Sequence, residues 1–338
     1  MRFSVVIPTH NRKELLQQVL LALAGQSYAQ DHYEVVVVVD GSEDGTIDML
    51  RQIEVPYGLR WMCQERRGVA RSRNAGAACA QGEIILFLDD DVIPVPDLLA
   101  EHARHHHDEK AVVIGRLSPA VGSKRPGWAR WEEQLLDRHF RTLDEKRRKV
   151  VGRHVYSGNF SVRKSHFVAI GGFDETLPRA EDIDLGYRLE QRGLHFYFSP
   201  RANGIHCGYR SFESWRKIPY QYGRLDVTLA RNKVFPAEWT RVFSTFHRRN
   251  PILRASVALC LGRKNTSRVC LGLLRGMAIC GDVLGLSRLT RYLYSGIYNL
   301  LYWQGVSDEV GGDAIFWQEI GRYHLGTGEY SYEFTRTH

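Results

Sequence analysis

The stretch Glu83-Ile-Ile-Leu-Phe-Leu-Asp-Asp-Asp-Val92 decides how this chain folds. Its five apolar residues predict a buried strand, because the run is too short for a typical helix and is bounded by polar residues. The strand then ends in Asp89, Asp90 and Asp91. Adjacent carboxylates repel one another unless a cation or a set of hydrogen-bond donors neutralises them. The triplet is therefore either a ligand-binding cluster or a solvated turn, and the rest of the chain must decide between the two.

Short apolar runs alternate with helical patterns on both sides of this strand. The runs predict strands at 3–7, 35–39, 59–64, 112–117 and 195–199, and the helical patterns lie at 15–23, 46–53 and 68–80. Alternating strands and helices favour a doubly wound, parallel sheet.

Polar side chains follow most of the predicted strands at the point where each strand ends. They are Thr9, Asn11, Arg12, Asp40, Arg66, Arg67 and the three aspartates. Because the carboxyl ends of parallel strands share one edge, where α/β proteins bind ligands, this convergence favours the ligand-binding interpretation. The first strand-to-helix turn has neither G-x-G-x-x-G nor a Walker-type loop, so phosphate charge would have to be met by a metal ion and arginines.

The second half of the chain adds acids and a histidine. Glu181 and Asp182 open a predicted helix that ends near Gly193, where they serve either chemistry or helix capping. Asp184 and Arg188 lie four residues apart on that helix, which predicts a structural ion pair. His206 follows a predicted strand that should reach the same edge, which makes it a candidate metal ligand.

Three other stretches are ambiguous. Residues 100–108 hold three adjacent histidines at the predicted polar end of a helix, where their side chains diverge and a metal site is not expected. Residues 123–153 hold ten basic residues and form either a mobile segment over the active edge or a solvated, charged helix. Helices are predicted at 251–262 and 267–304, and their apolar stripe beside arginines suits an anionic membrane or packing against the catalytic domain equally well: Leu271, Leu274, Ala278, Leu289, Tyr292 and Leu293.

Composition narrows the class of protein. The net charge of +8 indicates an anionic partner, such as a nucleotide, a nucleic acid or an acidic membrane surface. The six cysteines form no C-x-x-C pair, so we expect them to be reduced, in a cytoplasmic protein that has no signal peptide and no transmembrane helix. Peripheral contact with the inner face of the membrane is compatible with this expectation. Nucleic-acid binding is not expected, because the sequence contains no recognised reader motif.

As a set, six motifs resemble those of the family 2 glycosyltransferases, which have the GT-A fold. They are Val6-Ile-Pro-Thr-His-Asn-Arg12, Val39-Asp-Gly-Ser42, residues 68–74, residues 89–91, Gly172-Phe-Asp-Glu175 and Glu181-Asp182. The resemblance covers residues 3 to 210 or so, and it implies a mostly parallel sheet flanked by helices, as in nucleotide-diphospho-sugar transferases. The expected domains are a GT-A catalytic domain at 1–210, in which 1–117 bind the nucleotide sugar and 150–210 bind the acceptor and supply the base, and a helical, basic and aromatic extension at 211–338.

The resemblance also implies roles for individual residues. Pro8, Thr9, Asn11 and Arg12 would line the nucleotide pocket, with Asp40 on the base edge. Gly68 and Arg73 would lie beside the nucleotide, and Asp89 or Asp90 would face the ribose. Asp91, with His206 as a further ligand, would hold a divalent cation, Mn²⁺ or Mg²⁺. Asp182 would deprotonate the acceptor hydroxyl, and Glu181 would position it.

The implied activity is transfer, with inversion, of a sugar from a UDP-, GDP- or dTDP-sugar to a glycan or lipid-linked acceptor. It would serve polysaccharide or cell-envelope synthesis. Two alternatives remain at this point: a polyprenyl-phosphate sugar synthase, and a nucleotide-sugar-binding module without catalysis.

Overall fold

The computed structural model of the chain forms two compact units. The first contains residues 1–123 and 136–208, and the second contains residues 124–135 and 209–338. The structure describes residues 1–120, 125–145, 147, 149–231 and 236–323. Outside these residues lie Lys124, Lys146 and Arg148 of the basic stretch at 123–153, and Lys233 and residues 324–338 of the C-terminal extension.

The first unit is built on one eight-stranded sheet with the order β3-β2-β1-β4-β7-β6-β8-β5. The strands are β1 (Phe3–Thr9), β2 (Tyr33–Asp40), β3 (Gly58–Gln64), β4 (Ile84–Leu88), β5 (Val92–Pro94), β6 (Ala111–Pro119), β7 (Asn159–Arg163) and β8 (His195–His206). Six of them run in one direction, while β7 is antiparallel to β4 and β6, and β5 is antiparallel to β8. The predicted mostly parallel sheet is confirmed.

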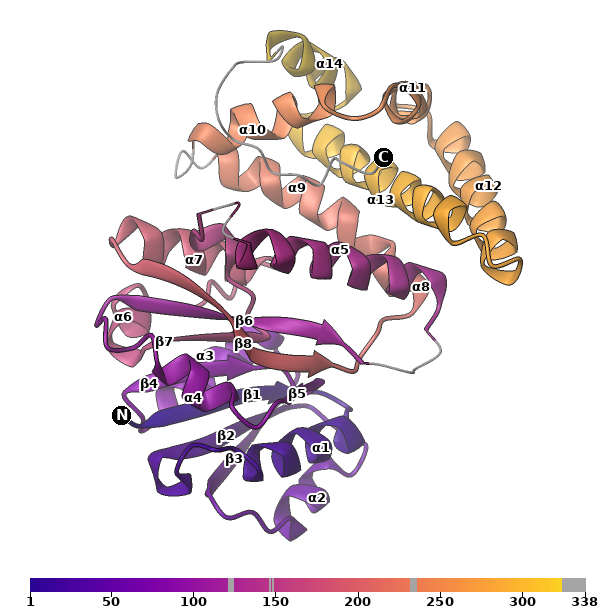
Figure 1. The fold of residues 1–338 in the computed structure, drawn as a ribbon. Helices are drawn as coiled ribbons and strands as arrows, with labels where there is room; N and C mark the ends of the chain where they lie inside the picture. The colour runs from indigo at the N-terminus through magenta and orange to yellow at the C-terminus, as the bar shows by residue number, and fades with distance from the viewer. Residues whose placement is uncertain (121–124, 146, 148, 232–235, 324–338) are drawn as a thin grey trace. The chain divides into compact units, whose positions relative to one another are not determined.

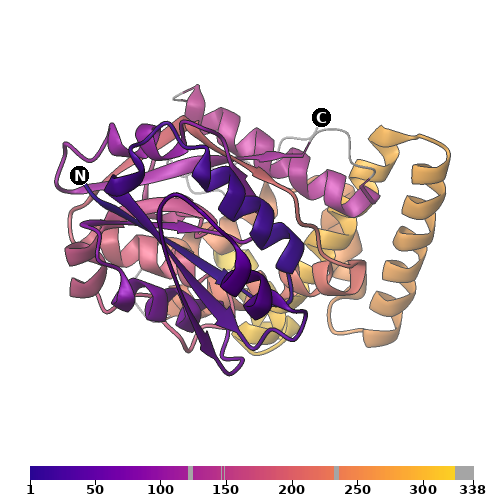
Figure 2. The same ribbon diagram turned by 90° about the horizontal axis from the view of Figure 1, so that it is seen from below.

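Helices cover both faces of this sheet (Figure 1), and Figure 2 shows the same arrangement from below. The helices α1 (Lys13–Ala24), α2 (Thr46–Gln52) and α4 (Leu98–Ala103) pack on one face, and α3 (Val69–Cys79), α6 (Lys164–Ala169) and α7 (Glu181–Gln191) on the other. A hydrophobic core lies on each face of the sheet, and strand β4 contributes side chains to both, because successive side chains of a strand point to opposite faces. Ile84, Leu86 and Leu88 join the first core, while Ile85 and Phe87 join the second.

Strand β8 is longer than the predicted strand at 195–199. It pairs with β6 in two stretches separated by a register shift at Gly115/Arg116, and it continues to His206. Three residues, 200–202, are left unpaired at this bulge. Pro200, Asn203 and Gly204 suggest a turn in the sequence, but the bulge accommodates the irregularity and the strand resumes.

The histidine run does not continue a helix as predicted. Helix α4 ends at Ala103, and residues 104–109 form turns. His102 and His106 are buried, and both rings lie within hydrogen-bond distance of the Ser161 hydroxyl, at 2.8 Å and 2.7 Å. Burial lowers the pKa of His102 to about 4, so the imidazole remains neutral in this polar part of the core.

One further segment can be compared with the sequence predictions. Residues 127–144 form helix α5 (Gly127–Asp144), in agreement with the charged-helix alternative, although Phe140 and Leu143 on it are buried. Short 3₁₀ turns lie at Gln30–His32 and Gly152–His154.

The second unit is helical in all its described elements. It contains α8 (Phe212–Trp215), α9 (Lys217–Arg231), α10 (Pro236–His247), α11 (Pro251–Cys260), α12 (Lys264–Val283), α13 (Ser287–Val310) and α14 (Asp313–Arg322). The single helix predicted at 267–304 is in fact two, because the chain turns at Gly285, whose φ of +69° favours glycine. Phe243, Trp303 and Phe316 form the centre of its core. No helix in the described part of the chain is long and apolar enough to cross a membrane.

Candidate active site

The predicted polar residues gather at the edge where the six parallel strands end. Thr9 ends β1, Asp40 ends β2 and His206 ends β8, while Asp89 follows β4 directly. Pro8 and Thr9 are buried within β1 and pair with β2.

Asp40 organises the turn between β3 and α3. Its carboxylate accepts hydrogen bonds from Gln64 Nε2 and Arg67 N, both at 2.8 Å, and from Gly68 N at 2.9 Å. Burial alone would raise the pKa of Asp40, but these hydrogen bonds lower it overall, so the group is held as an anion. Gly68 has a φ of +93°, which explains a glycine at this turn.

Asn11 connects two turns of the same edge. Its backbone adopts a left-handed conformation with a φ of 51°, which asparagine tolerates better than most residues. Its N–H donates to Ser42 Oγ at 3.0 Å, and its Oδ1 accepts from Glu43 N at 2.8 Å. The β1–α1 turn is therefore tied to the β2–α2 turn.

Arg12 neutralises two members of the aspartate triplet. Its Nη1 donates to Asp90 Oδ1 at 2.8 Å and to Asp91 Oδ2 at 2.5 Å. Both aspartates are buried, whereas the Arg12 side chain is about one-third exposed, at 37%. Burial would lower the pKa of Arg12, but the neighbouring carboxylates raise it overall.

Arg73 forms the corresponding ion pair with the third aspartate, Asp89. Its side chain is only 3% exposed, and its guanidinium donates to Asp89 Oδ1 at 2.7 Å and to Glu181 Oε1 at 2.8 Å. Arg73 lies on α3 and Glu181 on α7, so this residue joins two elements that are distant in sequence.

Asp182 lies beside this network, at the start of α7. Ala180, the residue before α7, has a left-handed φ of 56°, which is costly for a residue with a Cβ. Asp182 accepts a hydrogen bond from Ile183 N at 2.9 Å, and Ser157 N lies 3.4 Å from its other oxygen. Burial first, and then the neighbouring Glu181, raise the pKa of Asp182 to about 7. A carboxylate with that pKa can accept a proton near neutral pH.

His206 and Asp91, the two predicted metal ligands, lie close to each other. His206 Nε2 is 3.6 Å from Asp91 Oδ2, and Cys207 N donates to the Asp91 carbonyl at 2.8 Å. Within the described residues, no three His, Cys, Asp or Glu side chains converge to hold a metal ion. One carboxylate and one imidazole would nevertheless fit an ion that takes its other ligands from water and substrate phosphates, as Mg²⁺ commonly does.

The charge balance of the site also fits a cation. Five carboxyl groups, from residues 89–91, 181 and 182, lie close to the guanidinium groups of Arg12 and Arg73 in this network. Burial raises the pKa of Asp90 to about 6, against the opposing effect of Arg12. A cation that replaced Arg12 beside these carboxylates would supply the same compensating positive charge.

Gly208 is a residue of the site that sequence analysis missed. A Cβ added to it would lie 2.1 Å from Asp91 Oδ2, so the backbone at 208 can approach the carboxylate only as glycine. A glycine two residues after a predicted metal ligand was the available signal.

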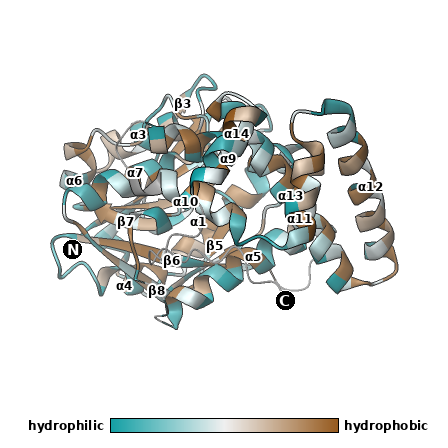
Figure 3. Ribbon diagram, turned by 90° about the horizontal axis from the view of Figure 1, so that it is seen from above, coloured by the Kyte–Doolittle hydropathy of each residue, from teal (hydrophilic) through white to brown (hydrophobic). Residues whose placement is uncertain are grey.

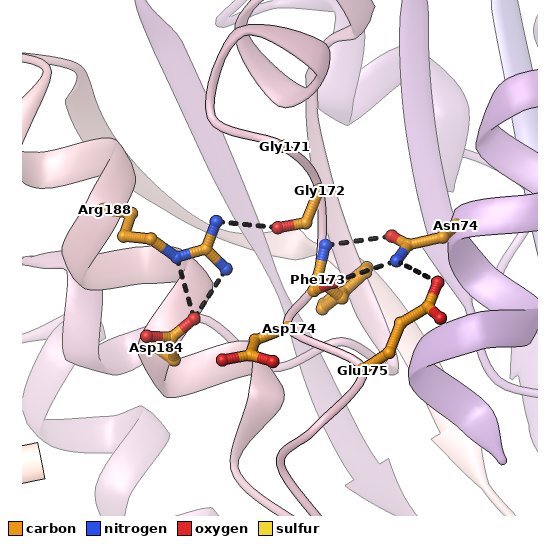
Figure 4. A pocket seen from close by; sticks show the side chains of 8 residues that line it. All are labelled: Asn74, Gly171, Gly172, Phe173, Asp174, Glu175, Asp184 and Arg188. Carbon is orange, nitrogen blue, oxygen red and sulfur yellow. Dashed lines mark hydrogen bonds and ion pairs between the residues drawn. The ribbon is translucent and has the colours of Figure 1, made fainter.

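Contacts that the sequence did not predict, made by Asn74 and Arg188, hold the loop at 170–175. Asn74 donates to the Phe173 carbonyl and accepts from its N–H, both at 2.9 Å (Figure 4). Arg188 Nη1 donates to the carbonyls of Ile170 and Gly172. The loop presents the Phe173 ring to Arg73, whose guanidinium carbon lies 5.6 Å from the ring centre.

This loop borders a pocket of about 460 Å³, which Figure 4 shows in close view. Its lining contains none of the predicted site residues and consists of Asn74, Gly171, Gly172, Phe173, Asp174, Glu175, Asp184 and Arg188. The predicted structural pair of Asp184 and Arg188 is confirmed by an ion pair of 2.5 Å.

Comparison with known proteins decides the family. The profile "Glycosyl transferase family 2" matches residues 4–171. The protein named "Uncharacterized glycosyltransferase YfnE", from Bacillus subtilis, is 31% identical over 301 residues, which cover 71% of this chain and 76% of that protein. The chain belongs to glycosyltransferase family 2.

A second relative of this glycosyltransferase is the validoxylamine A glucosyltransferase of Streptomyces hygroscopicus subsp. limoneus. It is 34% identical over 229 residues, which cover 60% of this chain and 51% of the relative. The chain thus spans about three quarters of the Bacillus protein and about half of the Streptomyces one.

Solved structures share the fold of the glycosyltransferase. The mannosyltransferase PcManGT from Pyrobaculum calidifontis, in complex with GDP-Man and Mn²⁺, has a TM-score of 0.60 at 21% identity, covering 90% of this chain and 86% of that one. S. aureus TarS 1-349 in complex with UDP-GlcNAc has a TM-score of 0.56 at 17% identity, covering 92% and 93%. The GT-A type fold with a helical C-terminal region is confirmed.

Proposed function

We propose that this glycosyltransferase transfers a sugar, with inversion, from a nucleotide-sugar donor to an acceptor hydroxyl. The observation that carries the proposal is the network from Arg12 through the aspartate triplet to Arg73 and Glu181, with Asp182 beside it. It provides cationic and acidic groups for a diphosphate and a proton acceptor near neutral pH in one compact unit.

The nucleotide would lie over the ends of β1 and β2. In this proposal Pro8, Thr9, Asn11 and Asp40 line the pocket for the base, and Gly68 and Arg73 lie beside the nucleotide. The fixed turns of this edge support the assignment, because a rigid site loses little entropy on binding. A GDP-sugar and a UDP-sugar bind to proteins of the same fold, so the donor class is expected here as well.

A divalent cation would be held by Asp91 and His206, with Asp89 or Asp90 towards the ribose. When bound, Mn²⁺ or Mg²⁺ stabilises the negative charge that develops on the leaving diphosphate. Arg12, now paired with Asp90 and Asp91, would turn its guanidinium to phosphate oxygens.

Asp182 would act as the base in a single displacement. The acceptor oxygen bonds to the anomeric carbon as the bond from that carbon to the diphosphate oxygen breaks. The hydroxyl proton passes to the Asp182 carboxylate, which Glu181 helps to position. Attack opposite the leaving group inverts the anomeric configuration, and no covalent enzyme intermediate forms.

A hydroxyl acceptor is favoured over a lipid phosphate. A phosphate monoester already carries negative charge at neutral pH, since its second pKa is about 6, and it needs no base. The raised pKa of Asp182 suits an acceptor that must lose a proton.

A thermal-shift screen of nucleoside diphosphates and nucleotide sugars, with and without Mn²⁺, tests the donor and the cation together. We expect one nucleotide to raise the melting temperature, and Mn²⁺ to increase this shift. The Asp91→Asn variant should lose the Mn²⁺-dependent part, whereas Asp48→Asn, an exposed acid on α2, should retain it. If Mn²⁺ does not change the nucleotide-induced rise in melting temperature of the unmodified protein, the cation assignment is contradicted.

A further inference from the structure

Helix α12 exposes an apolar stripe on its outer face. The helices α12 and α13 lie side by side, and α13 packs on α9, so α12 is the outer helix of these three (Figure 1). Its exposed side chains recur at helical spacing and are between 49% and 81% exposed: Val269, Leu273, Met277 and Val283. We call these four residues the outer stripe, and Figure 3 shows the hydrophobic colour along this helix.

Nothing in the described structure covers the outer stripe. A Cβ added to Gly272 or Gly276, which lie between its members, would meet no atom within 4 Å. The apolar surface continues into the turn to α13, where Leu284 is 71% exposed and Leu286 46% exposed.

The outer stripe is distinct from the apolar stripe predicted from the sequence. Ala278 is buried and Leu271 and Leu274 are partly buried in the core of the second unit. Helix α12 is therefore apolar on its inner and its outer side. A helix of that kind requires a second apolar environment besides the core of its own protein.

Positive charge is concentrated in the segment that contains this surface. Residues 248–306 contain nine Lys or Arg residues and one acid, Asp282, so their net charge of +8 equals that of the whole chain, and the remaining residues are neutral in sum. Asp282 is engaged internally, by Arg130 at 2.6 Å and by the Tyr294 hydroxyl at 2.8 Å. Arg268, Arg288 and Arg291 are exposed beside the apolar surface.

We propose that the outer stripe and the α12–α13 turn dock on the interface of an anionic lipid bilayer. The apolar side chains would enter the region of the headgroups, and the arginines would contact anionic lipids. A second copy of the chain fits less well, because an isologous contact would bring two equally positive surfaces together. The inference does not depend on the proposed donor or on the role of Asp182.

Co-sedimentation of the full-length protein with vesicles tests the proposal. The vesicles contain phosphatidylcholine with about one-third phosphatidylglycerol, or phosphatidylcholine alone. We expect the protein to sediment with the anionic vesicles at low salt, and the Val283→Glu/Leu284→Glu variant to lose about tenfold in partitioning. The Arg288→Gln/Arg291→Gln variant should lose about tenfold on anionic vesicles only.

The matched control is Leu21→Glu/Val168→Glu. It adds the same two negative charges at apolar residues of the first unit that are 52% and 60% exposed, and it should bind vesicles within about twofold of the unmodified protein. Unchanged melting transitions of both units, without added nucleotide, would show that each variant is folded.

Three outcomes would overturn the proposal. The first is recovery of the unmodified protein in the supernatant with anionic vesicles at low salt, and the second is a control that loses as much binding as the Val283→Glu/Leu284→Glu variant. The third outcome is a dimer in sedimentation velocity that the same variant converts to a monomer, with no vesicle binding, which would assign the surface to a second copy. Transfer to a water-soluble acceptor measures the proposed function separately.

Discussion

Asp182 is the residue on which the proposed reaction depends most directly. Replacement by asparagine keeps the shape of the side chain but removes the proton acceptor. We expect Asp182→Asn to lower kcat by about 10²- to 10⁴-fold with little effect on donor binding, which a transfer assay and a nucleotide thermal shift would measure. Asp48→Asn is the control, and an Asp182→Asn variant with full activity would exclude the assigned role.

The same substitution should stabilise the protein at alkaline pH. An ordinary aspartate has a pKa of 3.8, whereas that of Asp182 in the folded protein is raised to about 7. The unfolded chain therefore loses this proton at lower pH than the folded protein does. The contribution of Asp182 to the free energy of unfolding is therefore fully present below about pH 4 and is lost as the pH rises through about 7. We expect Asp182→Asn to melt at a higher temperature than the unmodified protein at pH 8, and the difference to shrink at pH 5.

The rate of transfer should also depend on pH through this group. The base is active when deprotonated, so kcat/KM for the acceptor should rise about tenfold per pH unit below pH 7 and level off above it. A pH profile with saturating donor would measure this. A flat profile between pH 5.5 and 8 would assign the proton transfer to another group.

Gly208 makes a steric prediction that is independent of charge. The Cβ of Gly208→Ala would overlap Asp91 Oδ2, so that the carboxylate or the backbone must move. We expect a loss of about 10²-fold in kcat/KM, because displacements near 1 Å at a reacting site have that effect. Gly276→Ala, on the open face of α12, should leave transfer unchanged. Equal activity of the two variants would show that Asp91 tolerates the displacement.

At the level of elements, the loop at 170–175 depends on one side chain of α3. Asn74 satisfies both backbone polar groups of Phe173. Asn74→Ala would leave them without these partners, which costs about 1–3 kcal/mol for a buried group. Urea unfolding would measure that loss. We also expect a reduced kcat, because the loop presents Phe173 to Arg73.

Asn74→Asp separates stability from positioning. It retains the acceptor for Phe173 N–H but lacks the donor to the carbonyl, so an intermediate loss of stability is expected. If kcat is unchanged in both Asn74 variants while stability falls, the loop has no influence on Arg73.

The sequence correctly predicted the elements whose residue pattern is compatible with only one type of secondary structure. The β-branched run at 35–39 is buried on both sides and forms β2, and the apolar run before Asp89 forms β4. Strand β7 was missed, since its five residues Asn159–Arg163 mix polar and apolar side chains and its antiparallel pairing is set by its neighbours β4 and β6. The helix predicted at 267–304 lacked any local signal for its break other than Gly285.

The site was predictable to the extent that it depends on strand ends. Each carboxylate of the triplet lies where the end of β4 places it, but its pairing with Arg12 or Arg73 depends on side-chain packing. The loop contacts of Asn74 and Arg188 and the role of Gly208 were not predicted, because they join segments that are distant in sequence or depend on a close approach of backbone.

For the whole molecule, the two compact units predict separable unfolding. Each unit has its own hydrophobic core, and all the proposed site residues belong to the first. Nucleotide with Mn²⁺ at about 100 times its Kd should stabilise that unit by about 2.7 kcal/mol, which raises its melting temperature by roughly 5 to 10 °C. The transition of the second unit should not shift.

Tryptophan fluorescence distinguishes the two transitions. Six of the seven tryptophans lie in the second unit, and Trp61 on β3 is the exception. Fluorescence should therefore follow the unfolding of the second unit, while calorimetry detects both. A single transition that shifts equally by both methods would show that the units unfold together.

The contact of Arg12 with Asp90 and Asp91 affects how the metal ion and the sugar donor bind. In the ligand-free protein the guanidinium already serves as the counter-ion of these carboxylates. Entry of a metal ion is then an exchange of one cation for another, and the free protein should have little affinity for Mn²⁺ alone. The diphosphate offers the displaced arginine a new partner, so metal and donor should bind with positive cooperativity. The occupancy of the metal site would then depend little on the metal concentration until the sugar donor is bound.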